Sequence, residues 1–465
     1  MFKWKKWSAL SALALLGSLA ACGDDYLTGE DLDTDPNRPV VASRDQLFVG
    51  MQVRQFIFHE GHITRVLAMW LQQMAGTDRQ YITLDKYEIT ESDFSPQFSA
   101  LYIGGGLLDM NKIQADAEAA GDRVYLGIVQ TWEAFAFGMA ASIWGAIPYS
   151  DAAGESATPT LDSQARVYAQ MQTLLDQAIA NLQSGAGSNP GSLDLVYGGS
   201  AAKWAGAANT LKARYYLHWV EAQAAGLADA NVACGGNCAQ KALAAAQKGI
   251  STPANDFRTF HTSKAGEDNI WYQFYRDRDS YTRVGRNFVE LLKARNDPRL
   301  PQLVAPVPLI APATGMGFVG APPATPLVTA STPSDIRLAQ DFRQPLITWG
   351  ENQLILAEAQ FRSGNSGAAL TNVNNVRTGA GLAALGSFGA SPLADIIAEK
   401  YIVLFQNMEV WNDYKRTCLP RITPFGGRVI PGRLLYGEAE RNVNPNIPPP
   451  SQQPARNAND PNACA

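Results

Sequence analysis

Long apolar runs and an excess of positive charge are both missing from most of this sequence. After the first 22 residues, no apolar stretch reaches the roughly 20 residues that a membrane-spanning helix needs. The 465-residue chain has 38 Lys and Arg against 43 Asp and Glu, a formal net charge of −5 at pH 7. Residues 1–21 hold three of the lysines, so without them the net charge falls from −5 to −8. This balance argues against nucleic acid as a partner, because a phosphate backbone requires a basic surface.

Recognisable catalytic motifs are missing as well. In His59-Glu60-Gly61-His62 the histidines are spaced by three, whereas the zinc protease motif needs His-Glu-x-x-His. Gly104–Gly106 is not followed by the Gly-Lys-Ser or Gly-Lys-Thr of a phosphate-binding loop. Nothing in the sequence singles out one pair of the 43 acidic residues for glycoside cleavage. We therefore expect a protein that is not an enzyme and that uses neither a cofactor nor a metal ion.

The chain begins with a lipoprotein signal peptide. Met1–Trp7 carries three lysines, Ser8–Leu16 is a short apolar stretch, and Leu19-Ala20-Ala21-Cys22 follows. A basic start, a short apolar run and small residues before a cleavage site are typical of secretion signals. We expect residues 1–21 to be removed and Cys22 to be acylated, so that the lipid anchors the protein to a membrane surface. A plain secreted protein with a chance cysteine is the alternative.

An acidic segment, residues 22–40, follows and predicts a flexible tether. It contains six carboxylates among turn-forming residues and is too polar to bury a face: Asp24, Asp25, Glu30, Asp31, Asp33 and Asp35. The alternate acidic spacing also resembles a calcium loop. That match is poor, because Pro36 replaces the required glycine and Ala42 stands where a bidentate glutamate belongs.

Four cysteines remain when Cys22 is set aside, and an oxidising compartment favours two disulfides. The pairing that is local in sequence joins Cys234 to Cys238 and leaves Cys418 for Cys464. A four-cysteine metal site is the other interpretation, although zinc ligands usually come in closely spaced pairs.

Apolar residues at spacings of three and four predict helices through most of the chain. The predicted helices cover 167–182, 201–224, 238–250, 351–362, 368–377 and 394–414. Glycines between 363 and 367 end one helix before the next begins, and small residues allow close crossing. The expected fold class is mainly α, a tetratricopeptide-like scaffold of helical hairpins.

Between these helical blocks, residues 253–342 form a proline-rich segment that predicts long irregular loops packed on one side of the scaffold. Helical pairs occur both before and after this segment. We therefore expect residues 41–465 to form a single domain.

Several separate segments carry a family resemblance. They occur in family order at Asp33–Pro39, Met69–Gln73, Trp144–Ala152, Asn296–Leu300, Glu358–Arg362, Asn374–Arg377, Glu399–Arg416 and Ile430–Tyr436. The chain resembles the SusD/RagB class of surface lipoproteins, especially its second SusD-like subfamily. Two positions depart from the family pattern: Ala146 replaces an acidic residue, and the closing Arg-Arg pair reads Lys415-Arg416.

The resemblance implies a receptor that captures nutrients, typically glycans, at the outer membrane. It also implies a partner, a SusC-like TonB-dependent barrel transporter on which such proteins sit as lids. The acidic stretch behind Cys22 is similar to surface-export signals in these lipoproteins, which implies that the protein faces the cell exterior. A helical scaffold that binds a protein partner and no small molecule is the alternative function.

A sugar offers apolar faces and many hydroxyls, so its receptor needs flat aromatic rings beside hydrogen-bonding groups. Two clusters have this composition. The first is Trp271, Tyr272, Tyr275, Arg276, Tyr281 and Arg283, and the second is Trp70, Gln73, Arg79 and Tyr81. A core role is the alternative for each aromatic residue. We assign four other tryptophans to the core: Trp144, Trp204, Trp219 and Trp411.

Overall fold

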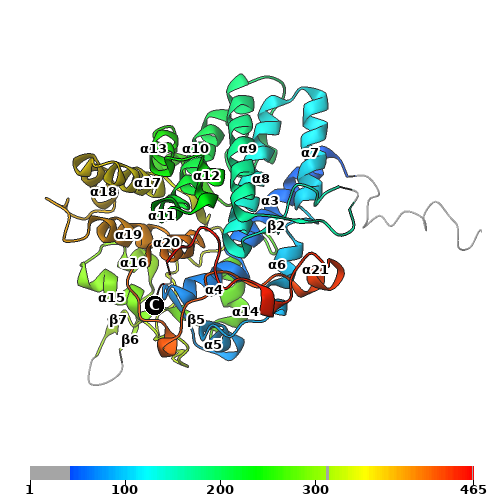
Figure 1. Ribbon diagram of the computed structural model, residues 1–465. Helices are drawn as coiled ribbons and strands as arrows, with labels where there is room; N and C mark the ends of the chain where they lie inside the picture. Colours follow the sequence, from blue (N-terminus) through cyan, green and yellow to red (C-terminus); the bar gives the residue numbers. More distant parts are fainter. Residues whose placement is uncertain (1–41, 155, 310–313, 463, 465) are drawn as a thin grey trace, which may run out of the picture. The chain divides into compact units, whose positions relative to one another are not determined.

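The computed structural model in Figure 1 describes residues 42–154, 156–309, 314–462 and 464. The predictions for residues 1–21, for lipidated Cys22 and for the acidic tether and its calcium alternative lie outside the described residues, apart from Ala42. Ser43 and Gln46 open the first described helix by exchanging hydrogen bonds between side chain and backbone, as an N-terminal cap does. From Leu47 onward the chain makes one compact unit.

The chain is mainly α-helical, as predicted. The helices before residue 250 are α3 (Arg44–Glu60), α4 (His62–Trp70), α5 (Arg79–Asp85), α6 (Ser95–Ser99), α7 (Leu107–Ala120), α8 (Arg123–Trp144), α9 (Gln164–Ser184), α10 (Ala201–Leu217), α11 (Val220–Ala224), α12 (Ala228–Cys234) and α13 (Cys238–Ala246). Those after residue 345 are α17 (Trp349–Arg362), α18 (Ser366–Gly379), α19 (Pro392–Val403), α20 (Glu409–Thr417) and α21 (Glu438–Val443).

Consecutive helices pack as pairs, and successive pairs pack on one another. α7 lies against α8, α8 against α9, α9 against α10, α10 against α13, α13 against α17 and α17 against α18. Gly127 permits the close contact of α8 with α9, because a Cβ there would meet the Ala178 carbonyl oxygen at 2.7 Å. The predicted hairpin scaffold is confirmed.

One predicted helix is wrong in its extent. The stretch 394–414 is two helices, α19 and α20, separated around Gln406, whose φ of +61° lies in the left-handed region. Distant side chains hold this break. The Arg337 guanidinium donates to the Gln406 side-chain oxygen at 2.8 Å, and the Gln406 backbone N–H donates to Gln73 at 3.2 Å. The predicted helix 201–224 also divides, into α10 and α11.

The segment predicted as irregular loops, 253–342, contains more regular structure than expected. Its elements are β4 (Phe257–Arg258), α14 (Ile270–Arg278), β5 (Thr282–Val284), α15 (Arg286–Ala294), α16 (Leu300–Leu303), β6 (Val307–Pro308) and β7 (Met316–Gly317). The strands elsewhere are β1 (Met74–Gly76), β2 (Ile147–Pro148), β3 (Leu161–Asp162) and β8 (Pro345–Ile347). They pair antiparallel as β1 with β5, β2 with β3, β4 with β8 and β6 with β7. Short 3-10 turns add η2 (Glu91–Phe94), η3 (Gly191–Leu193), η4 (Pro253–Asn255), η5 (Phe425–Gly427) and η6 (Pro450–Gln452).

Aromatic side chains fill much of the core. Trp144, Trp204, Trp219 and Trp411 are all buried, which confirms the prediction for these four. Both predicted disulfides are present, Cys234 with Cys238 between α12 and α13, and Cys418 with Cys464 near the carboxyl end. The alternative of a four-cysteine metal site is therefore wrong.

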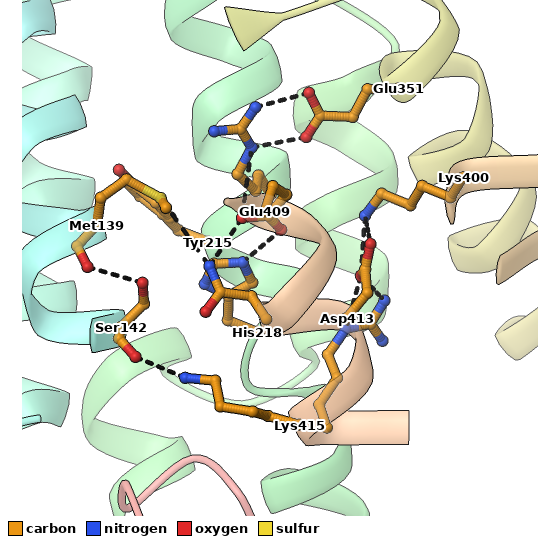
Figure 2. A network of polar contacts seen from close by, with 12 residues as sticks. Met139, Ser142, Tyr215, His218, Glu351, Lys400, Glu409, Asp413 and Lys415 are labelled. Atoms are coloured by element: carbon orange, nitrogen blue, oxygen red, sulfur yellow. Dashed lines mark hydrogen bonds and ion pairs between the residues drawn. The ribbon is translucent and has the colours of Figure 1, made fainter. Parts of the chain in front are cut away.

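Charged side chains are buried in the same core, where α10, α17, α19 and α20 meet (Figure 2). We call this group the ion network: Arg214, His218, Glu351, Glu358, Lys400, Glu409, Asp413 and Arg416. Arg214 donates to both Glu351 oxygens at 2.6 Å, and His218 lies 2.7 Å from Glu409. The Arg416 guanidinium donates to Glu358 at 2.5 and 2.6 Å and to Asp413 at 2.6 Å.

These pairings keep two of the buried carboxylates, Glu409 and Glu358, ionised. Burial by itself would raise the pKa of Glu409, but His218 and Arg214 beside it hold that pKa well below its ordinary value. In the same way Arg416 and Arg362 outweigh the burial of Glu358 and hold its pKa far below the ordinary value. The ion network therefore joins four helices through fully paired charges.

Candidate ligand-binding site

The two predicted binding clusters lie next to each other in the structure. β1 pairs with β5 so that Gly76 lies opposite Thr282. The loop after β1 therefore meets the loop before β5: the Thr77 backbone N–H donates to the Tyr281 carbonyl at 2.9 Å, and the Thr77 hydroxyl donates to the Ser280 carbonyl at 2.7 Å. Figure 1 shows α5, β5 and α14 side by side, although α5 is far from the other two in sequence.

Four side chains at this junction form what we call the tyrosine edge: Asp78, Arg79, Ser280 and Tyr281. Tyr281 is half-buried, and the guanidinium carbon of exposed Arg79 lies 5.9 Å from the centre of its ring. Asp78 accepts a 2.7 Å hydrogen bond from the Ser280 hydroxyl and a 2.9 Å bond from the Arg79 backbone N–H. The bond from Ser280 lowers the pKa of Asp78, so this surface carboxylate is ionised at neutral pH.

The backbone at the tyrosine edge adopts an unusual conformation. Arg79 has a φ of +48°, in the left-handed region that residues other than glycine rarely adopt. Asp78, which accepts from the Arg79 N–H, is the N-cap of α5. Backbone strain of this kind often accompanies functional sites, because the surrounding structure must hold it in place.

Two further predicted residues, Tyr272 and Arg276, lie on the outward side of α14. Asn269 caps this helix by accepting the backbone N–H groups of Trp271 and Tyr272. Tyr272 is half-buried, and exposed Arg276 lies one turn later with its guanidinium carbon 5.9 Å from the Tyr272 ring. Arg276 also pairs with Asp277 at 2.8 Å. Tyr272 and Arg276 thus remain available to solvent.

Three residues of the second predicted cluster are buried and belong to the core in this structure. The Trp70 indole N–H donates to the Leu84 carbonyl at 2.9 Å, and the Gln73 amide donates to the Tyr401 carbonyl at 2.7 Å. Tyr81 is buried, and its hydroxyl accepts from the Arg65 guanidinium at 3.1 Å. Because backbone and core groups already occupy these side chains, none of the three presents a free face to a ligand.

Three residues of the first cluster are buried too. Trp271 and Tyr275 lie on the inner side of α14, and the Tyr275 hydroxyl is 3.0 Å from the Thr282 hydroxyl. Arg283 donates to the Val328 carbonyl at 2.7 Å and so holds a neighbouring loop. Tyr81 of the second cluster supports the tyrosine edge from the core side, because its ring lies 5.8 Å from that of Tyr281.

Asp78 and Ser280 were not identified from the sequence. Asp78 follows β1 and Ser280 follows α14, so the two residues are far apart in sequence, and the pairing of β1 with β5 brings them together. A signal was present, because Asp78 and Arg79 form a charged pair beside a turn, but many exposed pairs of this kind have no function.

A cavity of about 330 Å³ lies apart from these residues, between α3 and the start of α14. Apolar side chains form most of its walls: Val49, Val53, Phe56, Ile57, Leu195, Phe260 and Ile270. His261, Glu267, Asp268 and Gln273 are its polar side chains. Sequence reasoning missed this cavity, because its walls come from three separate segments.

No group of three or more His, Cys, Asp or Glu among the described residues is placed to hold a metal ion. Within the same residues, no helix combines the length and apolar character needed to cross a membrane.

Residues 36–437 match a family model, SusD-like, described as "Starch-binding associating with outer membrane". A SusD/RagB family protein from Bacteroides thetaiotaomicron has a similar structure, with a TM-score of 0.73 and 21% identity over 88% of this chain and 95% of that chain. A chitin-binding protein gives a TM-score of 0.73 and 18% identity over 90% of this chain and 100% of that chain.

A chitin-binding SusD homolog from Flavobacterium johnsoniae gives a TM-score of 0.71 and 17% identity, over 90% of this chain and 98% of that chain. At these identities the likeness concerns the fold. No curated protein sequence matches this chain.

Proposed function

This chain belongs to the SusD-like family, and we propose that it binds a glycan at the cell surface and passes it to a TonB-dependent transporter of the outer membrane. Proteins of this family are binding proteins and not enzymes. The family's description names starch, and two proteins of similar structure are described as chitin-binding. These descriptions support an oligosaccharide as the class of ligand.

The observation that carries the site assignment is the tyrosine edge. A pyranose ring presents C–H groups that stack on an aromatic face, and Tyr281 offers such a face beside the solvent. The hydroxyl groups of a sugar need both hydrogen-bond acceptors and donors. The Asp78 carboxylate accepts, while the exposed Arg79 guanidinium donates in a planar fork. Aromatic, acceptor and donor groups are thus close together on one surface.

Tyr272 and Arg276 on α14 offer the same combination one helix away. Because Arg276 is already paired with Asp277 and Asp268, its capacity for a ligand is smaller than that of Arg79. We therefore assign the first sugar ring to the tyrosine edge.

Calorimetric titration of the mature protein tests the assignment. Maltooligosaccharides and chitooligosaccharides are the first two series to use. Tyr281→Ala is expected to weaken binding of the recognised series at least tenfold, about 1.4 kcal/mol, because the stacking face is lost. Tyr281→Phe retains the ring and is expected to stay within threefold of the parent protein.

Tyr272→Ala is the matched control, since it removes a half-buried tyrosine from α14 and leaves the tyrosine edge intact. Equal weakening by Tyr272→Ala and Tyr281→Ala would reject the assignment to the tyrosine edge. A mature protein that binds no oligosaccharide but copurifies with an outer-membrane barrel would instead favour the scaffold function.

The anchor and the transporter are parts of the same proposal. Cys22 follows a lipoprotein signal sequence, which supports lipid attachment, and the acidic stretch behind Cys22 supports an outward-facing position on the outer membrane. Growth of the native organism with an alkyne-labelled fatty acid is expected to label the protein, and Cys22→Ser is expected to remove both the label and membrane retention. Crosslinking in intact cells is expected to recover a barrel transporter, and recovery of the protein alone would contradict the partner proposed here.

A further inference from the structure

The cavity between α3 and α14 is a second site that the tyrosine edge does not include. Its volume of about 330 Å³ lies within the range of small-molecule pockets. Three of its apolar side chains are partly exposed to solvent, Val53 and Ile57 at 44% each and Phe260 at 39%. Large apolar side chains gathered around a hollow typically indicate a binding site, because covering them releases water.

The aromatic wall of the cavity is held in place before any ligand arrives. The Arg343 guanidinium carbon lies 5.5 Å from the Phe260 ring centre and covers one face of it. Arg343 itself donates to the Thr259 carbonyl at 2.6 Å and to the Leu195 carbonyl at 2.9 Å. This fixed arrangement reduces the entropy that a ligand loses on ordering its pocket.

The polar side of the cavity is acidic. Asp268 is only 2% exposed; its Oδ2 lies 3.3 Å from Arg276, and its Oδ1 has no hydrogen-bond partner in the described part of the chain. Glu267 is exposed and accepts from the Thr262 hydroxyl at 2.7 Å. His261 adds no free donor, because its ring nitrogens already face Glu60 at 2.8 Å and the Glu267 carbonyl at 3.2 Å.

We infer that this cavity binds a small molecule with an apolar body and an amine or hydroxyl head group. The apolar body lies against Val53, Ile57 and Phe260, and the head group is directed toward the side of Glu267 and Asp268. Carboxylate oxygens accept hydrogen bonds, so the acidic side of the cavity favours donors and cations over an anion. The site is separate from the glycan site proposed above, and its existence does not depend on that function.

Three probes of the same shape and different charge test this inference: 3-phenylpropylamine, 3-phenylpropanol and 3-phenylpropanoate. Each is titrated into the mature protein and followed by calorimetry and ligand-observed NMR. The amine is expected to bind with a Kd of about 0.1–1 mM, as suits a ligand of this size, and the alcohol more weakly. The carboxylate is expected to bind at least tenfold more weakly than the amine.

Paired variants locate the site. Val53→Gln is expected to weaken the amine at least fivefold, whereas the control Val443→Gln, at an exposed valine on α21, is expected to change nothing. Glu267→Gln is expected to reduce the preference for the amine over the alcohol at least threefold while leaving the alcohol unchanged. Equal binding of all three probes, or equal effects of the two valine variants, would overturn the inference.

A competition experiment separates this site from the glycan site. Saturating amine is expected to leave the oligosaccharide titration unchanged, and Tyr281→Ala is expected to leave the amine titration unchanged. Displacement of the oligosaccharide by the amine would overturn the separate site and leave the proposed function standing. Amine binding in a protein that binds no oligosaccharide would support the separate site and contradict the proposed function.

Discussion

The ion network and the tyrosine edge are built from similar side chains under opposite conditions. In the ion network the Arg416 side chain is 1% exposed and meets two carboxylates at hydrogen-bond distance. At the tyrosine edge the Arg79 side chain is 68% exposed, and its Nε lies 3.9 Å from an Asp78 oxygen. The donors of Arg416 are bonded to protein carboxylates, while most of the donors of Arg79 face the solvent.

This difference separates charges that hold the fold from charges that are available to a ligand. A buried ion pair costs desolvation on both sides, so it persists only when each member has a partner. An exposed pair contributes little to stability, so its side chains can exchange partners at small cost. Variants should therefore affect stability in the ion network and binding at the tyrosine edge.

Arg416→Ala is expected to have the largest effect. It leaves the Glu358 and Asp413 carboxylates buried without their main partner, which costs about 3–5 kcal/mol of unfolding free energy. Urea denaturation followed by circular dichroism measures the loss. Arg79→Ala is the control and is expected to change stability by less than about 0.5 kcal/mol. Similar losses in both variants would remove the distinction between the two regions.

Asp85→Asn sharpens the comparison, because Asp85 is a buried carboxylate that pairs with no cation among the residues the structure describes, and it lies close to the tyrosine edge. Its Oδ2 accepts the backbone N–H groups of Gly76 at 2.8 Å and Ala324 at 2.7 Å. Burial raises its pKa to about 7, against the attraction of these two donors. The folded protein thus favours the neutral carboxyl, which contributes stability below the unfolded pKa of 3.8, and this contribution is lost as the pH rises to about 7.

Asparagine is neutral at every pH and still offers an oxygen to both donors. Asp85→Asn is therefore expected to be more stable than the parent protein at pH 8 by about 4 kcal/mol, with the gain shrinking toward pH 4. Thermal and urea denaturation at both pH values measure it. The ion network has the opposite sign: the pKa of Glu409 is lowered, so its contribution is present above pH 4.5 and is lost as the pH falls. A gain that does not depend on pH would contradict the assignment of a neutral Asp85.

The helical scaffold was largely predictable, because the apolar stripe of a helix is a local property. The stripe on 167–182 predicted α9, which the structure extends to Gln164–Ser184. The break between α19 and α20 was not predictable, since Gln406 is held by Gln73 and Arg337, which are distant in sequence. Cysteine spacing was sufficient for the disulfides, because one pair is local and only one partner then remains.

The candidate site was predictable only in composition. Aromatic and polar residues around 70–81 and 269–286 were identified, but side-chain direction depends on how α14 turns its faces. Trp271 and Tyr275 point inward, while Tyr272 and Arg276, each the next residue in the sequence, point outward. Asp78 and Ser280 joined the site through strand pairing, which single-sequence periodicity does not report.

Asp78→Ala is expected to act on binding. It removes the acceptor for the Ser280 hydroxyl and a carboxylate that faces the solvent, so oligosaccharide affinity is expected to fall about fivefold. Because the pKa of Asp78 is lowered, this carboxylate stays ionised above its ordinary value of 3.8, and the affinity of the parent protein is expected to be constant between pH 5 and pH 8. Calorimetry at three pH values tests both statements. An affinity that follows a transition near pH 7 would point to Asp85 as the controlling group.

Arg79→Lys is expected to have the smallest effect and to probe the tyrosine edge most finely. Lysine keeps the positive charge but loses the planar fork of donors and the flat contact with the Tyr281 ring. Oligosaccharide affinity is expected to fall about threefold, while stability in urea stays within about 0.5 kcal/mol of the parent protein. If charge alone mattered, lysine would match arginine in binding. A full match would show that Arg79 acts through its charge, and a loss as large as that of Tyr281→Ala would show that the arginine, more than the tyrosine ring, determines recognition.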